Sequence, residues 1–277
     1  MLASIALAGG APLIVSRPAR AETALERIRR EGVVTVGTEA AYPPFEFVQN
    51  GQIVGYGKDL LTHVISALGV RLVQLDLPWQ GILPGLLANK FDFVATTVSI
   101  NEERARRYAY TLPIANGLPY ILKRRNDPMT HVSELNGKVV ATQLASASEP
   151  VARALDARLK AAGGPGFRRL RLFPAFPDCF VALASREVDA VVQSLPPLTV
   201  LVRQQPNTFA LMGPALEGGP PVFVAWVTRP ADTDLRDFIS GVFRRLRDDG
   251  TMGQLQDKWF GLRMEIPDSG YLPPGAI

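Results

Sequence analysis

The chain has 277 residues, of which 47% are hydrophobic and 20% are charged. This length and balance fit a folded protein with one large domain or two lobes, and they exclude a disordered chain. The formal charge of +4 comes without a long basic run, and one cysteine with two histidines leaves no internal disulfide and no cysteine- or histidine-rich metal site, so we expect no nucleic-acid partner, no metal and no cofactor.

The N-terminus has the pattern of a secretory signal peptide. Residues 2–15 are almost all apolar, and Ala19-Arg20-Ala21 forms a small-x-small cleavage site before Glu22. A basic segment before Leu2 is missing from the pattern. The apolar run is too short to span a bilayer as an anchor. We therefore predict a signal peptide over residues 1–21.

Strand-like and helix-like segments then alternate, which predicts an α/β unit with a parallel sheet and crossover helices. Gly51 to Gly57 is rich in turn residues and predicts a hairpin, and Gly69 is expected to end a helix. The predicted helices cover residues 23–30, 58–68 and 81–88. The predicted strands cover residues 33–37, 70–75 and 91–96.

A second α/β unit begins near Leu118. Its predicted helix over residues 148–162 has Ser148 as the N-cap and ends at Gly163-Gly164. Two segments rich in proline and glycine, 113–119 and 213–221, predict the crossings between the units. Strands are predicted over residues 118–123, 138–142, 188–193 and 223–227, and a last helix over residues 234–247, followed by an aromatic and glycine-rich segment.

Six stretches in register resemble the polar amino-acid solute-binding proteins of bacterial ABC transporters, family 3. The densest is PWQGILPGLLANKFDFVATTVSINEERARRYAYT, residues 78–111. The others are VGTEAAYPPFEF (36–47), GQIVGYGKDLL (51–61), LNGKVV (135–140), REVDAVV (186–192) and DGTMGQLQDKWFG (249–261).

The resemblance implies an α/β fold of the two-lobed, type II-like periplasmic binding protein kind. Each lobe would have a central sheet flanked by helices, with two crossing strands at the hinge and the ligand in the cleft. The implied limits are residues 22–116 and 222–277 for a discontinuous lobe 1, residues 117–213 for lobe 2 and residues 214–221 for the hinge.

The function implied is that of a periplasmic binding component of an ABC transporter. Its partners would be a small carboxylate ligand, an amino acid first of all, and a permease in the inner membrane, and we expect a monomer. Three alternatives stay open: a keto or hydroxy acid as ligand, a dehydratase-like enzyme on the same fold, and a sensor. We expect no sensor fused to this chain, because no signalling segment follows the last predicted helix.

The ligand-binding residues implied begin with Arg104, because a guanidinium can donate two parallel hydrogen bonds to one carboxylate. Otherwise Arg104 would be a solvated charge on a helix. Thr97 and Ser99 would add polar contacts at a strand end. Ser146 and Ala147 would bring the N-terminus of a helix from lobe 2 to the same carboxylate.

The remaining implied residues surround the other end of the ligand. Tyr42 and Trp79 would form aromatic walls or, alternatively, pack in the core, where Phe45 is expected. Glu39 would accept from an ammonium or from a basic side chain of the ligand, unless it is an exposed loop carboxylate. Ser194 stands where amino-acid binders commonly have an aspartate for the α-ammonium, so either Glu39 supplies that charge or the ligand lacks an α-ammonium.

Overall fold

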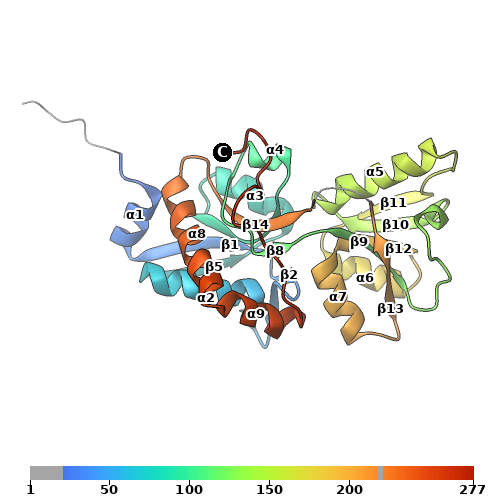
Figure 1. Ribbon diagram of the computed structural model, residues 1–277, viewed down its shortest axis with the longest axis horizontal. Helices are drawn as coiled ribbons and strands as arrows, with labels where there is room; N and C mark the ends of the chain where they lie inside the picture. The colour runs from blue at the N-terminus through green and yellow to red at the C-terminus, as the bar shows by residue number, and fades with distance from the viewer. Residues whose placement is uncertain (1–20, 217–220) are drawn as a thin grey trace, which may run out of the picture.

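The computed structural model describes residues 21–216 and 221–277. These residues form two lobes, each built around its own sheet, which lie side by side along the long axis of the molecule (Figure 1). The predicted signal peptide, apart from Ala21, lies outside the described residues. Within the described part of the chain, no helix is both long enough and apolar enough to cross a membrane.

The sheet of lobe 1 has the order β5-β1-β6-β14-β7, with β8 paired to β14. Strands β5, β1 and β6 are parallel, whereas β14 runs antiparallel to β6, β7 and β8. The bounds are β1 (Val33–Thr38), β5 (Arg71–Asp76), β6 (Phe93–Ser99), β7 (Ala109–Tyr110), β8 (Ala115–Asn116) and β14 (Phe223–Thr228). A small antiparallel sheet adds β2 (Ala41–Tyr42), β3 (Glu46–Gln49) and β4 (Gln52–Val54).

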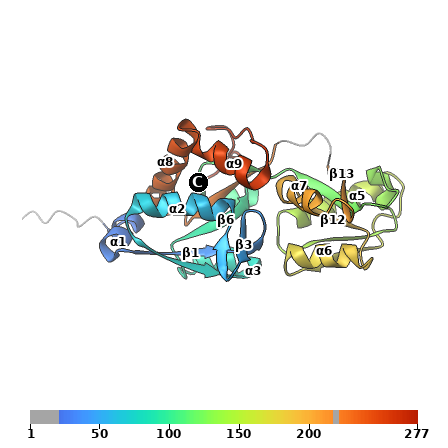
Figure 2. The ribbon, with the colours of Figure 1, turned by 90° about the horizontal axis from the view of Figure 1, so that it is seen from below.

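Alternating side chains of β6 allow helices to cover both faces of this sheet. Phe93 and Ala95 pack on one side and Val94 and Val98 on the other. Figure 2 shows α2, α8 and α9 on the first side and α3 on the second. The helices of lobe 1 are α1 (Ala24–Glu31), α2 (Tyr56–Leu68), α3 (Trp79–Leu87), α4 (Glu102–Ala105), α8 (Thr233–Asp248) and α9 (Thr251–Phe260).

The sheet of lobe 2 has the order β11-β10-β12-β9-β13, of which the first three strands are parallel. Helix α5 packs on one face, and α6 and α7 pack on the other, where Cys179 is fully buried with a free thiol. The bounds are β9 (Pro119–Arg124), β10 (Val139–Gln143), β11 (Arg169–Phe173), β12 (Ala190–Ser194), β13 (Phe209–Pro214), α5 (Ser148–Ala161), α6 (Phe176–Ala184) and α7 (Leu195–Gln204), with a 3-10 turn over Val132–Leu135.

Two neighbouring segments join the lobes. The chain leaves lobe 1 after β8 and returns to it before β14, and these two strands pair through Asn116 and Phe223. Figure 1 shows β8 and β14 on the side of lobe 1 that faces lobe 2. The exact residues at which the lobes and the hinge begin and end remain a prediction from the sequence.

The predicted strands and helices all appear, with ends shifted by a few residues, and Phe45 is buried as expected. The prediction of parallel sheets was correct for β1, β5 and β6 and for β10 and β12. It was wrong for β9 and β14, which run antiparallel to their neighbours. Ser148 is not the N-cap of α5: Ala147 holds that position, and Ser148 is the first helical residue.

Candidate functional site

A cavity of about 200 Å³ lies between the two lobes. It lies at the C-terminal ends of parallel strands of both sheets, where open α/β sheets bind ligands. Its lining residues are Glu39, Tyr42, Trp79, Thr97, Ser99, Ile100, Asn101, Arg104, Gly117, Pro119, Gln143, Ser146, Ala147, Ser148, Pro150, Val151, Phe176, Ser194, Val222 and Val224.

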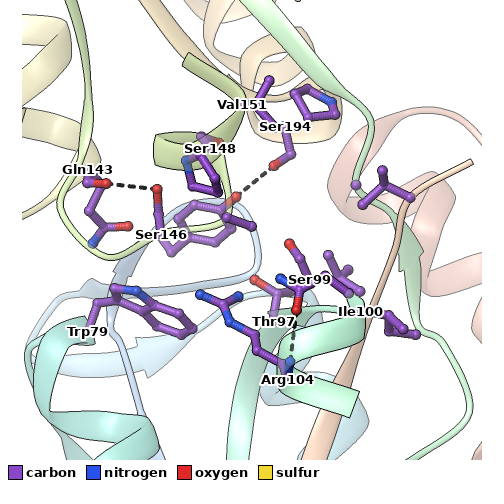
Figure 3. Close-up of a pocket in the computed structure, with 18 of the residues that line it drawn as sticks. Trp79, Thr97, Ser99, Ile100, Arg104, Gln143, Ser146, Ser148, Val151 and Ser194 are labelled. Carbon is purple, nitrogen blue, oxygen red and sulfur yellow. Dashed lines mark hydrogen bonds between the residues drawn. The ribbon is translucent and has the colours of Figure 1, made fainter. Parts of the chain in front are cut away.

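Strand β6 and helix α4 supply the polar floor of the cavity. Thr97 and Ser99 are alternate residues of β6, so both face the cavity while Val98 faces the core. Asn101 caps α4 by accepting a hydrogen bond from the backbone N–H of Arg104 at 2.9 Å. The cap fixes the start of α4 and directs the Arg104 side chain into the space between the lobes (Figure 3).

The Arg104 guanidinium has no acidic partner within the described chain. Among these residues its side chain donates one hydrogen bond, from Nη2 to the carbonyl of Ala145 in lobe 2, at 3.0 Å. Its carbon Cζ lies 5.3 Å from the centre of the Trp79 ring, a cation–π distance. Burial lowers its pKa from the ordinary value, but a guanidinium remains charged. A partly buried, unpaired cation favours an anionic ligand.

The turn after β10 faces Arg104 from lobe 2. Ala145 adopts a left-handed backbone with φ of 60°, and its carbonyl accepts hydrogen bonds from Arg104 and from Trp79 Nε1, the latter at 2.9 Å. Ser146 donates its hydroxyl to the carbonyl of Gln143 at 2.8 Å. Ala147 has no side chain that can cap α5. Glu149 N–H donates to the carbonyl of Ser146 at 3.3 Å and Pro150 has no N–H, so Ser148 N–H is the donor of this first turn that could face a ligand.

Glu39 follows β1 and is buried at the cavity wall, with 6% of the residue exposed. Its Oε1 accepts a short hydrogen bond from Gln143 Nε2 of the other lobe. Burial, with a smaller contribution from the nearby charge of Asp76, raises the pKa of this carboxyl to about 7. Such a carboxyl gains a strong interaction when a cation enters next to it.

Ser194 ends β12 and pairs across the cleft. Its Oγ and the phenol oxygen of Tyr42 lie 2.7 Å apart (Figure 3). The Tyr42 ring stacks on Phe45 and contacts Phe176, each with ring centres 5.6 Å apart. The hydroxyl and the ring faces of Tyr42 are therefore used by the protein itself.

All residues that the sequence nominated for ligand binding line this one cavity. Their contacts with a ligand stay a prediction. The sequence did not nominate Gln143, Phe176 or the apolar residues of the crossing segments. Gln143 stands at a strand end, which is the signal that could have found it, while Phe176 and Val224 look like ordinary core residues in the sequence.

The fold and the cavity define a two-lobed solute-binding protein with its ligand site in the cleft. The chain belongs to the bacterial extracellular solute-binding proteins, family 3, whose model matches residues 34–262. This confirms the family that the six sequence stretches indicated.

Relatives with known names agree with this class. The L-cystine-binding protein TcyJ of Escherichia coli (strain K12) is 25% identical over 246 residues, which are 87% of each chain. A mutant of ArgBP from T. maritima has a TM-score of 0.75 and 30% identity, covering 86% of this chain and 100% of its own. The ancestral amino acid-binding protein AncCDT-1, a precursor of cyclohexadienyl dehydratase, has a TM-score of 0.76 and 26% identity, with coverage of 86% and 100%.

Proposed function

We propose that this protein captures an amino acid in the periplasm and delivers it to an ABC permease in the inner membrane. The signal-like N-terminus supports secretion, and the family supports transport. The observation that carries the proposal is the Arg104 guanidinium in the interlobe cavity, which has no acidic partner among the described residues.

In this proposal the ligand carboxylate lies between the lobes at Arg104. The two terminal nitrogens of the guanidinium form a fork for one carboxylate. Hydroxyls of Thr97 and Ser99 lie beside it in lobe 1, and the N-terminus of α5 faces it from lobe 2. One ligand group held from both lobes stabilises the closed arrangement relative to the open one.

The ligand ammonium pairs with Glu39 in this proposal. Ser194 carries no charge, and its hydroxyl is already bonded to Tyr42. Among the described residues that line the cavity, Glu39 is the one acidic residue. Within the described chain, its Oε1 takes part in a hydrogen bond and its Oε2 does not. Its Oε2 is therefore available to accept from an ammonium.

Isothermal titration calorimetry of Arg104→Ala tests the carboxylate anchor. Loss of two charge-assisted hydrogen bonds weakens binding by at least about 100-fold. The matched control is Arg106→Ala, an exposed arginine of the same segment that pairs with Glu102 at 3.4 Å and does not line the cavity. Equal affinities of Arg104→Ala and wild type for the same amino acid would contradict the assignment.

Catalysis is a second candidate because the Glu39 carboxyl has a pKa of about 7, a value suited to a general acid. The likeness to a precursor of a dehydratase points the same way. We favour binding, since Gln143 already occupies one oxygen of this carboxyl. Incubation with prephenate or arogenate decides between catalysis and binding. Turnover by wild type that disappears in Glu39→Gln would establish an enzyme, and no turnover by wild type would favour the binding protein.

A further inference from the structure

We infer that the ligand is a zwitterionic amino acid whose side chain is small, uncharged and apolar. This inference rests on the proposed amino-acid function and narrows it. It differs from what the names of the cystine- and arginine-binding relatives would suggest.

The charges that line the cavity balance one carboxylate and one ammonium. Among the described lining residues, Arg104 is a cation, Glu39 is a carboxyl that becomes an anion beside an ammonium, and all others are neutral. A ligand with one carboxylate at Arg104 and one ammonium at Glu39 leaves neither unpaired. A second positive or negative group on the ligand would enter the cavity without a partner, and an unpaired buried charge is costly.

Trp79 and Tyr42, two of the aromatic residues that line the cavity, already have neighbours at their rings. Trp79 already has the Arg104 guanidinium at 5.3 Å from its ring centre. Tyr42 has Phe45 and Phe176 as ring neighbours, both with centres 5.6 Å away. A lysine or arginine side chain would thus compete with these neighbours for a cation–π contact at Trp79 or Tyr42.

One wall of the cavity is apolar. In Figure 3, Arg104 lies between Trp79 and Ile100. Val151 belongs to the first turns of α5. Val222 and Val224 from the second crossing segment complete this wall, together with Pro119 and Pro150. A Cβ on Gly117 would lie 2.8 Å from Val224 Cγ1, so the glycine keeps this wall close to the crossing strand. These residues offer contact to an aliphatic group and no hydrogen bond from a side chain.

The size of the cavity favours a short side chain. Its volume of about 200 Å³ is below the range of roughly 300 to 1,000 Å³ of ordinary small-molecule pockets. We therefore expect a short side chain, such as that of alanine, 2-aminobutyrate or valine.

Calorimetry on the wild-type protein tests the inference with a matched panel. The panel holds alanine, 2-aminobutyrate and valine against lysine, arginine, aspartate and glutamate, with lactate as the hydroxy analogue of alanine. We expect the neutral amino acids to bind at least tenfold more tightly than every charged one and than lactate.

The outcomes separate the two proposals. Tighter binding of arginine or glutamate would overturn the inference and leave the amino-acid function in place. Tighter binding of lactate would contradict the pairing of a ligand ammonium with Glu39, and with it the inference that the ligand is zwitterionic. Failure of every amino acid to bind would overturn the proposed function itself.

A pair of variants at Val151 tests the charge balance directly. Val151→Asp adds one negative charge to the cavity wall, and Val151→Asn adds the same shape without the charge. We expect the ratio of lysine affinity to valine affinity to rise at least tenfold in the Asp variant relative to the Asn variant. Equal ratios would contradict the dependence of selectivity on cavity charge, and unchanged thermal midpoints establish that both variants are folded.

Discussion

Glu39 makes stability depend on pH through its burial. Its pKa in the folded protein, about 7, lies above the ordinary value of 4.5, so between these values the folded state holds a proton that the unfolded state has lost. Raising the pH through this window therefore lowers the free energy of unfolding, by at most about 3 kcal/mol. Below about pH 4.5 the difference vanishes.

The isosteric variant Glu39→Gln removes this pH-dependent cost. The substituted amide would keep an oxygen that accepts from Gln143 Nε2. We expect the free energy of unfolding of the ligand-free variant, measured in urea, to exceed that of wild type by up to about 3 kcal/mol at pH 8. At pH 4.5 the two free energies should be equal. Glu103→Gln, at a largely exposed position of α4, serves as control. If wild type is as stable as Glu39→Gln at pH 8, burial does not make ionisation of the Glu39 carboxyl unfavourable.

At the scale of elements, the turn between β10 and α5 combines backbone strain with contacts to the other lobe. Ala145 has φ of 60°, a conformation that glycine adopts without steric cost. Ala145→Gly is expected to raise the free energy of unfolding by up to about 1 kcal/mol and to keep the carbonyl that accepts from Trp79 and Arg104. Chemical denaturation measures the effect.

The control for this turn is Ala157→Gly. Ala157 is exposed in the middle of α5, where glycine costs about 0.5–1 kcal/mol. The two substitutions are chemically identical and have opposite expected signs. If Ala145→Gly destabilises as much as Ala157→Gly, the left-handed turn is not strained.

The elements that the sequence predicted are those with clear helical spacing or clear β runs. Helix α2 with its stop at Gly69 is one such case. Helices α6 and α7 were missed because Pro177 and Pro196-Pro197 look like helix breakers, whereas proline is accepted in the first turn of a helix. Strand direction was missed at β14 because an apolar run does not encode whether its neighbour is parallel.

The site was predictable to a different extent. Ser99 at the end of β6 and Arg104 in α4 could be nominated because they fall in stretches that resemble the family. The bonds of Tyr42 to Ser194 and of Glu39 to Gln143 join residues 152 and 104 positions apart, from different lobes. No local pattern reports such pairs, because they arise only when the two sheets face each other.

For the whole molecule, direct hydrogen bonds between the lobes favour the closed arrangement. Gln80 of α3 donates through Nε2 to the carbonyls of Leu144 and Pro174 in lobe 2, at 3.2 and 3.1 Å. It does not line the cavity. Gln80→Ala is therefore expected to weaken ligand affinity about tenfold by shifting the population toward open lobes.

Calorimetry gives the affinity of Gln80→Ala, and small-angle scattering gives the spread of its lobes. The control is Gln52→Ala, an exposed position on β4 within lobe 1. An affinity within twofold of wild type would show that these two interlobe bonds do not contribute to closure.

The single cysteine gives this molecule a practical property. Cys179 is fully buried in lobe 2, and burial raises the pKa of its thiol far above the ordinary value. The thiolate, which reacts with alkylating dyes, is therefore scarce and shielded at neutral pH. One cysteine placed on the surface of each lobe would accept maleimide fluorophores without removal of the native residue. Energy transfer between two such labels would report the opening and closing of single molecules as ligand arrives and leaves.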